Sequence, residues 1–384
     1  DGLRASGGAR HPHVLTCTLR CLRGLVRCEI GGNTAADAGG GLYAHASVAD
    51  LDSCTVADNS AVNRGGGLYT HEGGAVDLDD CTISGNTSAN GGGVFIQGPA
   101  TSSLVRVRFA GNAATGSGGG LSERDGAVTT FDHCEFQGNT ADLGGGVYNV
   151  FSCRETFTAC TFTGNAATTR GGAMRIYTQA DVTLDRCLLW GDSAGLGKEI
   201  AVSSSCTLAV GCSDVAGGMA AIDDSDHTSV IAWGAGNIDA FPYFCDGAGG
   251  DLGLVDGVSP CLPAGNPCGV QIGAHGADCA PPSATDDGIA VPPVTRLDAA
   301  RPNPFNPATT IGFALAAPGP ARLLVYDARG RLVRVLLDEP RPAGPGAVTW
   351  DGRDGQGRTV GAGVYFHCLQ AGGMSLTGKM TLLK

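Results

Sequence analysis

The feature that most restricts how this chain can fold is a repeat of 26 or 27 residues. Glycine triplets such as Gly91-Gly92-Gly93 return at that step, and so does a column of polar residues that is asparagine in all but its last copy. The column consists of Asn33, Asn59, Asn86, Asn112, Asn139, Asn165 and Asp192. A ligand-binding loop is made once, whereas a structural unit is copied, so the repeat predicts a solenoid.

Composition and alternation indicate which kind of solenoid forms. Of 384 residues 63 are glycine, too many for helix interiors, and segments such as residues 76–83 alternate apolar and polar residues as strands do. A repeat this regular brings the chain back onto itself in register, which is the pattern of a parallel β-helix. Residues 1–279 are therefore predicted to form a parallel β-helix with right-handed crossovers and coils about 4.8 Å apart.

A second column, five residues before the asparagines, is mostly cysteine. Its regular members are Cys54, Cys81, Cys134, Cys160 and Cys187. Alternation turns these side chains into the core. The Cβ atoms of stacked neighbours point in parallel directions, which is the wrong geometry for a disulfide, so free thiols are expected. The asparagines are expected to pair amide to amide between coils at a corner.

The chain has 16 cysteines, and those outside this column are the candidates for disulfides. Cys212 lies 25 residues after Cys187 and is interpreted as continuing the column. Any disulfides are expected among Cys261, Cys268 and Cys279 near one end of the β-helix, and among Cys17, Cys21 and Cys28 at the other. The sequence has no CxxC pair, so its cysteines indicate neither a zinc motif nor a thioredoxin-like one, and no metal ligand is predicted.

The segment "FQGNTADLGGGVY", residues 136–148, represents a pattern that recurs over about residues 28–275. This pattern resembles the repeats of right-handed parallel β-helix proteins of the pectin-lyase-like fold, particularly those akin to chlamydial polymorphic outer-membrane proteins. The resemblance implies the fold of this region. It does not select a function, because the fold hosts adhesins, surface spacers and polysaccharide-cleaving enzymes alike.

The character of the sequence changes after residue 279. Residues 280–296 lack periodicity and are rich in proline, alanine and aspartate, which predicts a linker. Short alternating segments, bounded by proline, glycine and Asp-Gly turns, then occupy residues 297–384. They predict a small β-sandwich as a second domain, so the whole chain is expected to be all-β.

Residues 303–315, "NPFNPATTIGFAL", and residues 350–366, "WDGRDGQGRTVGAGVYF", carry a second resemblance. They resemble the type A C-terminal sorting domain of the type IX secretion system, which is similar to the immunoglobulin-like domain of the flagellar hook-capping protein. The motif residues are Asn303, Pro304, Phe305, Asn306 and Pro307. The resemblance implies an immunoglobulin-like sandwich, the secretion machinery as a partner, and a protein that is secreted or displayed on a bacterial cell surface.

Targeting and charge features restrict the function classes further. The chain has no initiator methionine and no apolar leader, so a signal is expected to have been removed or to lie outside this sequence. No run of about 18 or more apolar residues occurs, so no transmembrane helix is expected. The net charge of −12 argues against nucleic acid as a partner, because the phosphates would be repelled.

The outer face of one predicted sheet carries a strip of acidic residues. Stacking at the repeat distance places Asp50 beside Asp77 and Asp52 beside Asp79, with Asp80 following in the chain. The strip continues with Asp132 and Asp185 and also holds Arg106, His133 and Arg186. Carboxylates about 4.8 Å apart are expected to raise one another's pKa, and they can bind Ca²⁺ or act as an acid–base pair.

Two hypotheses for function follow. The first is a non-catalytic β-helical rod that acts in adhesion or as an envelope spacer, with a surface glycan or another envelope protein as a partner. The alternative is an extracellular polysaccharide lyase or hydrolase that uses Asp77, Asp79 and Asp80. The only cofactor predicted as a candidate is Ca²⁺, bound by the acidic strip. The regular coil length favours the rod, because a polysaccharide cleft generally requires long loops as walls.

Overall fold

The computed structural model describes residues 15–18, 24–224, 226–247, 250–280, 295–341, 343–372 and 374–383. The chain divides into two compact units, Asp1–Cys279 and Ala280–Lys384. Most of the predicted linker, residues 281–294, lies outside the described residues. Regular structure in the described residues is all-β, as predicted, apart from two short 3-10 helices at Met219–Ala221 and Pro263–Gly265. No helix in these ranges has the length and apolar character needed to cross a membrane.

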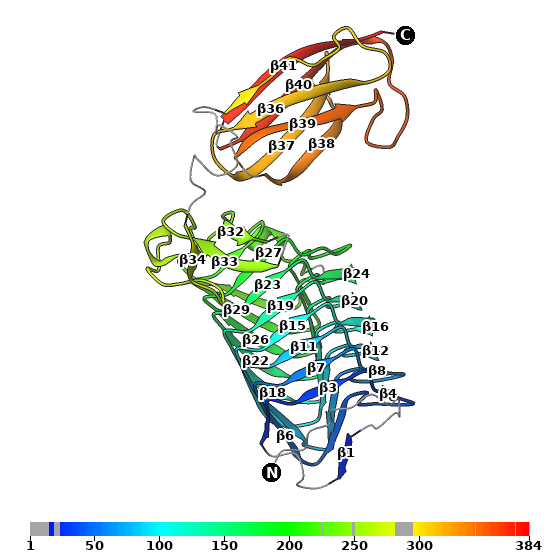
Figure 1. Cartoon of the computed structure of the whole chain (residues 1–384), viewed down its shortest axis with the longest axis vertical. Helices are drawn as coiled ribbons and strands as arrows, with labels where there is room; N and C mark the ends of the chain where they lie inside the picture. The colour runs from blue at the N-terminus through cyan, green and yellow to red at the C-terminus, as the bar shows by residue number, and fades with distance from the viewer. Residues whose placement is uncertain are drawn as a thin grey trace. The chain divides into compact units, whose positions relative to one another are not determined.

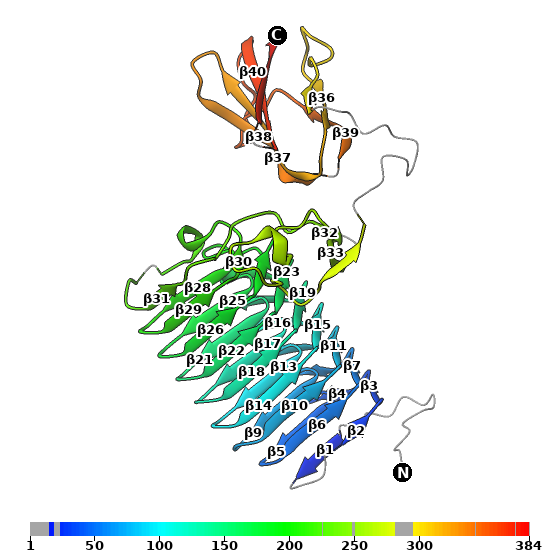
Figure 2. The same cartoon turned by 90° about the vertical axis from the view of Figure 1, so that its left-hand side faces the viewer.

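The first unit is a parallel β-helix in which every coil adds a strand to the same sheets (Figures 1 and 2). The first sheet has the order β1 (Leu15–Thr18), β5 (Leu42–His45), β9 (Leu68–His71), β13 (Val94–Gln97), β17 (Leu121–Arg124), β21 (Val147–Val150), β25 (Met174–Tyr177) and β28 (Ile200–Ser203). The second has the order β2 (Leu25–Val26), β6 (Val48–Asp52), β10 (Ala75–Asp79), β14 (Thr101–Val105), β18 (Val128–Asp132), β22 (Arg154–Thr158), β26 (Asp181–Asp185), β29 (Thr207–Gly211) and β31 (Val230–Trp233).

Two further parallel sheets complete the coils. The third sheet has the order β3 (Glu29–Gly31), β7 (Thr55–Ala57), β11 (Thr82–Ser84), β15 (Arg108–Ala110), β19 (Glu135–Gln137), β23 (Thr161–Thr163), β27 (Leu188–Trp190) and β30 (Asp214–Val215). The fourth sheet has the order β4 (Thr34–Ala35), β8 (Ser60–Ala61), β12 (Thr87–Asn90), β16 (Ala113–Ser117), β20 (Thr140–Leu143) and β24 (Ala166–Arg170). Each step between regular coils is one sequence repeat, so residues 26 or 27 apart become direct neighbours, and the last step from β29 to β31 is 23 residues.

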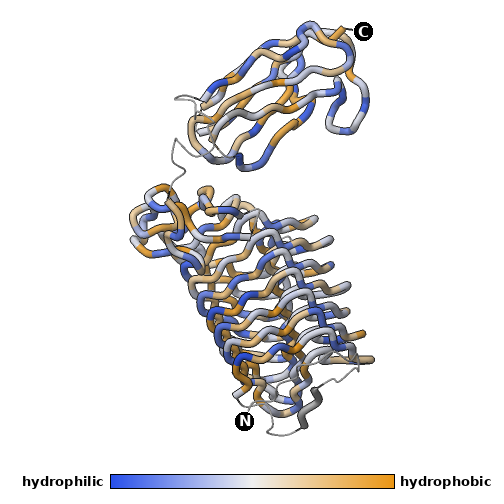
Figure 3. Tube along the Cα trace, viewed as in Figure 1, coloured by the Kyte–Doolittle hydropathy of each residue, from blue (hydrophilic) through white to orange (hydrophobic). Residues whose placement is uncertain are grey.

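Stacked apolar side chains fill the interior of the coils. The Phe109, Phe136 and Phe162 rings lie parallel with centroids 4.6 Å apart, and all three are fully buried. The regular members of the cysteine column are buried and unpaired. Figure 3 shows hydrophobic and hydrophilic residues alternating along the coils, and this alternation allows one chain segment to face both the core and the solvent.

The asparagine column forms a continuous hydrogen-bonded ladder at the corner between the third and fourth sheets. Asn112 represents its interior: Nδ2 donates to Asn139 Oδ1 at 3.0 Å and to the Ile83 carbonyl at 2.8 Å. Its Oδ1 accepts from the backbone N–H and the Nδ2 of Asn86. At the last step Asp192 Oδ1 accepts both bonds from Asn165. Each buried amide thus satisfies backbone groups that the turn leaves without a sheet partner.

The glycine triplets lie at the next corner of the same coils, and the geometry of that corner requires glycine. Gly91 has a φ of +61°, a left-handed conformation that glycine adopts without steric penalty. At Gly92 a Cβ atom would lie 2.5 Å from the Ala113 carbonyl oxygen of the next coil. The triplets are therefore required by close backbone packing, and they need no ligand to explain them.

One polar cluster interrupts the apolar core where the first and second sheets meet. Its members are Glu123, Thr129, Asn149, Cys153 and Glu155, and all are buried. Asn149 lies in register with Glu123, and Asn149 Nδ2 donates to Glu155 Oε2. Burial raises the pKa of Glu123, and burial together with the Glu123 charge raises the pKa of Glu155 well above its usual range. The folded protein therefore retains protons here that the unfolded chain releases.

Two disulfides fasten the irregular closing coils, which include β32 (Phe244–Asp246), β33 (Asp251–Val255) and β34 (Ala277–Cys279). Cys212 bonds to Cys268 and Cys245 bonds to Cys279, with Cα atoms 5.9 and 6.0 Å apart. The expectation that Cys261, Cys268 and Cys279 would pair among themselves is wrong. Cys261 is buried and unpaired, and its thiol donates to a carboxylate oxygen of Asp214.

The interpretation of Cys212 as a member of the cysteine column is also wrong. Ser213 occupies that position, because its Oγ accepts the Cys187 N–H as the next cysteine Sγ does in earlier coils. Cys212, with a φ of +48°, takes the outward corner position that Arg186 holds one coil earlier, and from there it reaches Cys268. At the other end Cys28 is unpaired, while Cys21 and the side chain of Cys17 lie outside the described residues.

The second unit is an antiparallel β-sandwich, as predicted. One sheet has the order β35 (Arg296–Leu297), β36 (Thr309–Leu315) and β39 (Gly344–Trp350). The other has the order β38 (Leu332–Arg341), β37 (Gly319–Asp327), β40 (Gly363–Ala371) and β41 (Met374–Leu382). Trp350, Phe305 and Leu323 are among the buried residues of its core.

The ladder predicts a large loss of stability when one interior rung is removed. Asn112→Ala removes the acceptor of the buried Asn86 N–H and one donor to the Ile83 carbonyl, and should lower the free energy of unfolding by about 1–3 kcal/mol. Urea denaturation followed by circular dichroism measures this loss. The exposed Asn63→Ala is the control and should shift the midpoint little. Equal shifts for the two variants would contradict a stabilising role for the ladder.

The buried glutamates predict a pH dependence. Their raised pKa values mean that their stabilisation is complete below pH 4.5, the ordinary pKa of glutamate, and is lost as the pH rises. Wild type should therefore lose stability relative to E123Q/E155Q as the pH increases above 4.5, by up to about 1.4 kcal/mol per pH unit for each retained proton. Denaturation curves across the pH range test this, with the exposed Glu29→Gln as a control. Parallel stability profiles for wild type and the double variant would be the opposing result.

Candidate functional site

The acidic strip lies on the exposed face of the second sheet, and four of its aspartates contact a neighbouring arginine or histidine. Asp50 pairs in register with Asp77, and Asp52 pairs with Asp79. Arg106 from the next coil contacts Asp79 and Asp80, with both N–O distances 2.5 Å. Further along, Asp132 contacts His133 at 2.9 Å, and Asp185 contacts Arg186 at 3.2 Å.

These pairs change the expected electrostatics. Stacked carboxylates were expected to raise one another's pKa, but the Arg106 guanidinium lowers the pKa of Asp80 by hydrogen bonding to it. Asp77 Oδ1 accepts the Ser103 N–H at 3.2 Å. Asp77, Asp79 and Asp80 belong to neither of the groups of three metal-ligating side chains that the described residues bring within 4.8 Å. Around Asp79 and Asp80 the strip is therefore a solvated ion-pair surface.

A hollow of about 600 Å³ lies elsewhere, along the outer face of the first sheet. Its lining consists of residues 34–38 with Tyr43, Arg64, Tyr69, His71 and Gln97. In-register pairing stacks Tyr43 on Tyr69 with ring centroids 5.3 Å apart. The Tyr69 hydroxyl donates to Gln97 Oε1 at 3.0 Å. Aromatic faces beside a few polar groups are typical of a ligand-binding surface, and we call this hollow the aromatic groove.

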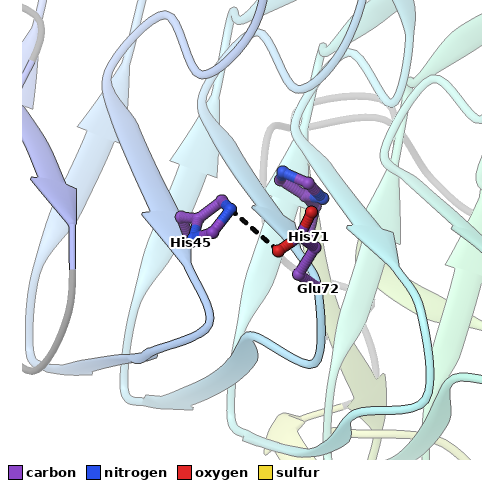
Figure 4. Close-up of side chains that lie close together, drawn as sticks. All are labelled: His45, His71 and Glu72. Carbon is purple, nitrogen blue, oxygen red and sulfur yellow. Dashed lines mark ion pairs between the residues drawn. The ribbon is translucent and has the colours of Figure 1, made fainter.

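A cluster of metal-ligating side chains borders the aromatic groove, which His71 also lines (Figure 4). His45 and His71 lie in register on β5 and β9, with ring centroids 4.6 Å apart and the rings edge to face. Glu72 follows β9, and its Oε2 lies 3.0 Å from His45 Nε2. We call these three residues the histidine cluster. These residues were not predicted from the sequence as metal ligands, although the two histidines stand at the repeat distance, where a comparison of each column of the repeat finds them.

The second group of potential ligands is Glu123, Cys153 and Glu155 in the core. Burial, with Glu155 as the next largest cause, strongly raises the pKa of the Cys153 thiol, and burial raises the pKa of both carboxyls. Metal ligands bind in their deprotonated forms, so this group favours protons over a cation.

The motif at residues 303–307 is part of the folded sandwich. Phe305 is buried and packs on Trp350 with ring centroids 5.5 Å apart. Asn303 Nδ2 donates to the Lys379 carbonyl and its Oδ1 accepts the Thr381 N–H. The Phe305 backbone also pairs with β41, donating to the Thr381 carbonyl and accepting the Leu383 N–H. The motif therefore fastens the last strand to the body of the domain.

Sequence analysis did not single out a second hollow, of about 560 Å³, in the sandwich. Two loops with the same spacing line it, each with an aspartate that binds an arginine four residues later. Asp327 contacts Arg331 and Asp354 contacts Arg358, both at 2.8 Å. Hydrogen bonds from the backbone N–H groups of these arginines lower the pKa of each aspartate. These acids are therefore structural groups of the turns.

Comparisons with known proteins support the two folds. Residues 23–189 match the family described as right handed beta helix region, which agrees with the predicted handedness. Residues 303–372 match the FlgD Ig-like domain. No curated protein matches the chain.

Similar solved structures include dimeric latent PorU from Porphyromonas gingivalis, at 24% identity over 25% of this chain and 10% of that one, with a TM-score of 0.20. Another is PorZ from the same organism, described as an essential bacterial surface component of the type-IX secretion system. It is 21% identical over 27% of this chain and 12% of that one, with a TM-score of 0.17. The similarity thus covers about a tenth of each of those chains.

The position of Phe305 predicts that truncating its side chain destabilises the sandwich. Phe305→Ala should lower the stability of the second unit by about 3–5 kcal/mol, because it leaves a cavity against Trp350. Hydrogen exchange of the β36, β39 and β41 amides in the full chain measures the loss, and the β-helix amides provide an internal reference. The exposed Leu332→Ala is the control. Unchanged protection in Phe305→Ala would show that the motif is not part of the core.

Proposed function

We propose that the chain is a secreted or cell-surface β-helical rod with a structural or adhesive role, exported through its C-terminal domain. The observation that carries this proposal is the constancy of the coil. The repeat stays at 26 or 27 residues from Asn33 to Asp192. Ladder amides, glycine corners and stacked apolar side chains recur at the same inward positions of successive coils, so the repeat supports a rigid extended surface.

The acidic strip does not favour the hydrolase form of the enzymatic hypothesis. A glycosidase needs one carboxyl group that holds a proton at neutral pH and a second that does not. Arg106 favours the ionised form of Asp80, and Asp79 shares the same arginine. The structural hypothesis is therefore preferred over the enzymatic one. A depolymerisation assay on pectic and other acidic polysaccharides, with D77N/D79N/D80N as a control, discriminates between them.

Partners of the rod are proposed from its surface. The aromatic groove offers stacked tyrosine faces and hydrogen-bonding groups, which suit the apolar faces and hydroxyl groups of a sugar. A surface glycan is thus the first candidate ligand, and another envelope protein is the second. A glycan array probed with wild type and with Tyr69→Ala tests the groove.

The C-terminal domain is proposed to be the export signal, on the strength of the motif and the FlgD Ig-like match. Fusing residues 297–384 and a signal peptide to an unrelated passenger should send that passenger to the surface or the medium of a host with the type IX system. Cell fractionation measures the distribution. The fusion that carries Val335→Ala, an exposed position outside the hollow of the sandwich, should behave as wild type. The Phe305→Ala fusion should be retained because its domain is destabilised.

Truncation supplies the complementary arm of this experiment. Removing residues 280–384 should leave the β-helix with nearly the same melting temperature, while the truncated protein accumulates in the periplasm. Retention of the wild-type fusion in the periplasm, with the native protein exported normally beside it, would contradict the sorting role.

A further inference from the structure

We propose that His45, His71 and Glu72 bind a divalent transition metal ion of the Zn²⁺ type. Their ligand atoms lie within 4.8 Å of one another. Figure 4 shows the three side chains converging from adjacent coils, with the His45 ring facing the Glu72 carboxylate. Small side-chain rotations would bring all three to the distances of about 2.0–2.2 Å at which zinc binds imidazole and carboxylate. Metal binding by these residues is independent of the proposed structural role of the rod.

The backbone fixes the relative positions of the ligands. His45 and His71 are register partners in the parallel pairing of β5 with β9, so their Cα atoms cannot drift apart while the sheet is intact. Glu72 has a φ of +55°, and this left-handed corner turns the chain so that its carboxylate returns beside the imidazoles. The same corner carries Ala46 in the preceding coil and Gly98 in the following one, so only this coil of the three supplies a carboxylate.

The donor set selects the class of metal. Two imidazole nitrogens and one carboxylate oxygen suit Zn²⁺, Co²⁺ and Ni²⁺, whereas Ca²⁺ takes about six to eight oxygen ligands. The side chains of His45 and Glu72 are 32% and 62% exposed, so an ion can enter from solvent. Three protein ligands leave a coordination position open for water or another ligand. Because His71 also lines the aromatic groove, a bound ion would lie at the border of that groove.

Other histidines with carboxylate partners lack this arrangement. Among the described carboxylates, His133 forms its ion pair with Asp132. His275 contacts Glu135 through Nε2 at 2.7 Å and Asp278 through Nδ1 at 3.9 Å, on opposite sides of one ring. Of the described residues, those of the histidine cluster are the ones that bring two imidazoles and a carboxylate together. An ion pair between His45 and Glu72 without metal would contribute little at such an exposed site.

The test is zinc binding by the full-length chain, produced without a polyhistidine tag and stripped of metal with a chelator. Titration calorimetry with Zn²⁺, together with elemental analysis after dialysis, should give one equivalent bound. His71→Ala should weaken binding by about 100-fold or more, since even the loss of an outer-shell partner costs about 10–100-fold. His45→Ala and Glu72→Gln should act in the same direction. Circular dichroism checks that these surface variants remain folded.

Matched control variants distinguish this site from other metal-ligating side chains of the protein. His133→Ala removes a similarly exposed histidine and should leave zinc binding unchanged, and so should Cys153→Ser in the buried group. The Co²⁺ form should show d–d bands without a sulfur-to-cobalt charge-transfer band, and Ca²⁺ should not compete. The proposal is overturned if wild type binds no zinc, if His71→Ala binds it as wild type does, or if Cys153→Ser abolishes binding and the cobalt spectrum shows sulfur ligation.

Discussion

The β-helix depends on hydrogen bonds that run along its axis, and the asparagine ladder is the part of that network on which the corners rely. A corner breaks the sheet and leaves backbone groups without strand partners, which is unfavourable when they are buried. Asparagine carries both a donor and an acceptor, so each side chain bonds backbone groups of its corner and also the asparagine of the next coil. The steps between rungs are 26 or 27 residues, and the amides remain paired across both lengths. The extra residue must therefore fall at another corner, because an insertion beside the ladder would move an amide out of register.

Register has a second consequence, which is that the surface is also built in columns. Equivalent positions of successive repeats lie side by side, so two residues of the same type become neighbours, as Tyr43 and Tyr69 do in the aromatic groove. Two histidines in this relation make a metal-binding pair, and two carboxylates make a repulsive one. The acidic strip resolves the repulsion with Arg106, which lies one coil further on and binds Asp79 and Asp80 together. In-register stacking therefore creates binding sites where the stacked side chains are ligands, and it requires a compensating charge where they are like-charged.

The sequence predicted the features that repetition determines and missed those that depend on where repetition fails. The stacked sheets and the buried phenylalanines follow from period and alternation, and both are present. The Cys212–Cys268 disulfide could not be predicted, because Ser213 takes the column position and Cys212 is turned outward by a one-residue shift. The histidine cluster needed a different comparison, since its third ligand, Glu72, owes its place to a left-handed corner that spacing alone does not reveal.

At residues 303–307 a substitution cannot distinguish a loss of recognition from a loss of folding. Phe305 is in the core and its backbone is paired with β41, so the motif cannot be read as a linear peptide while the sandwich is folded. Substituting it removes both the signal and the fold that presents it. A receptor that recognises the folded domain must contact exposed groups, such as the turns that hold the Asp327–Arg331 and Asp354–Arg358 pairs. Charge reversal at the exposed Arg331 and Arg358, with Asp327 and Asp354 kept for the N–H groups of their turns, would alter the surface and leave the core around Trp350 in place. It therefore separates recognition from folding in a way that the motif itself cannot.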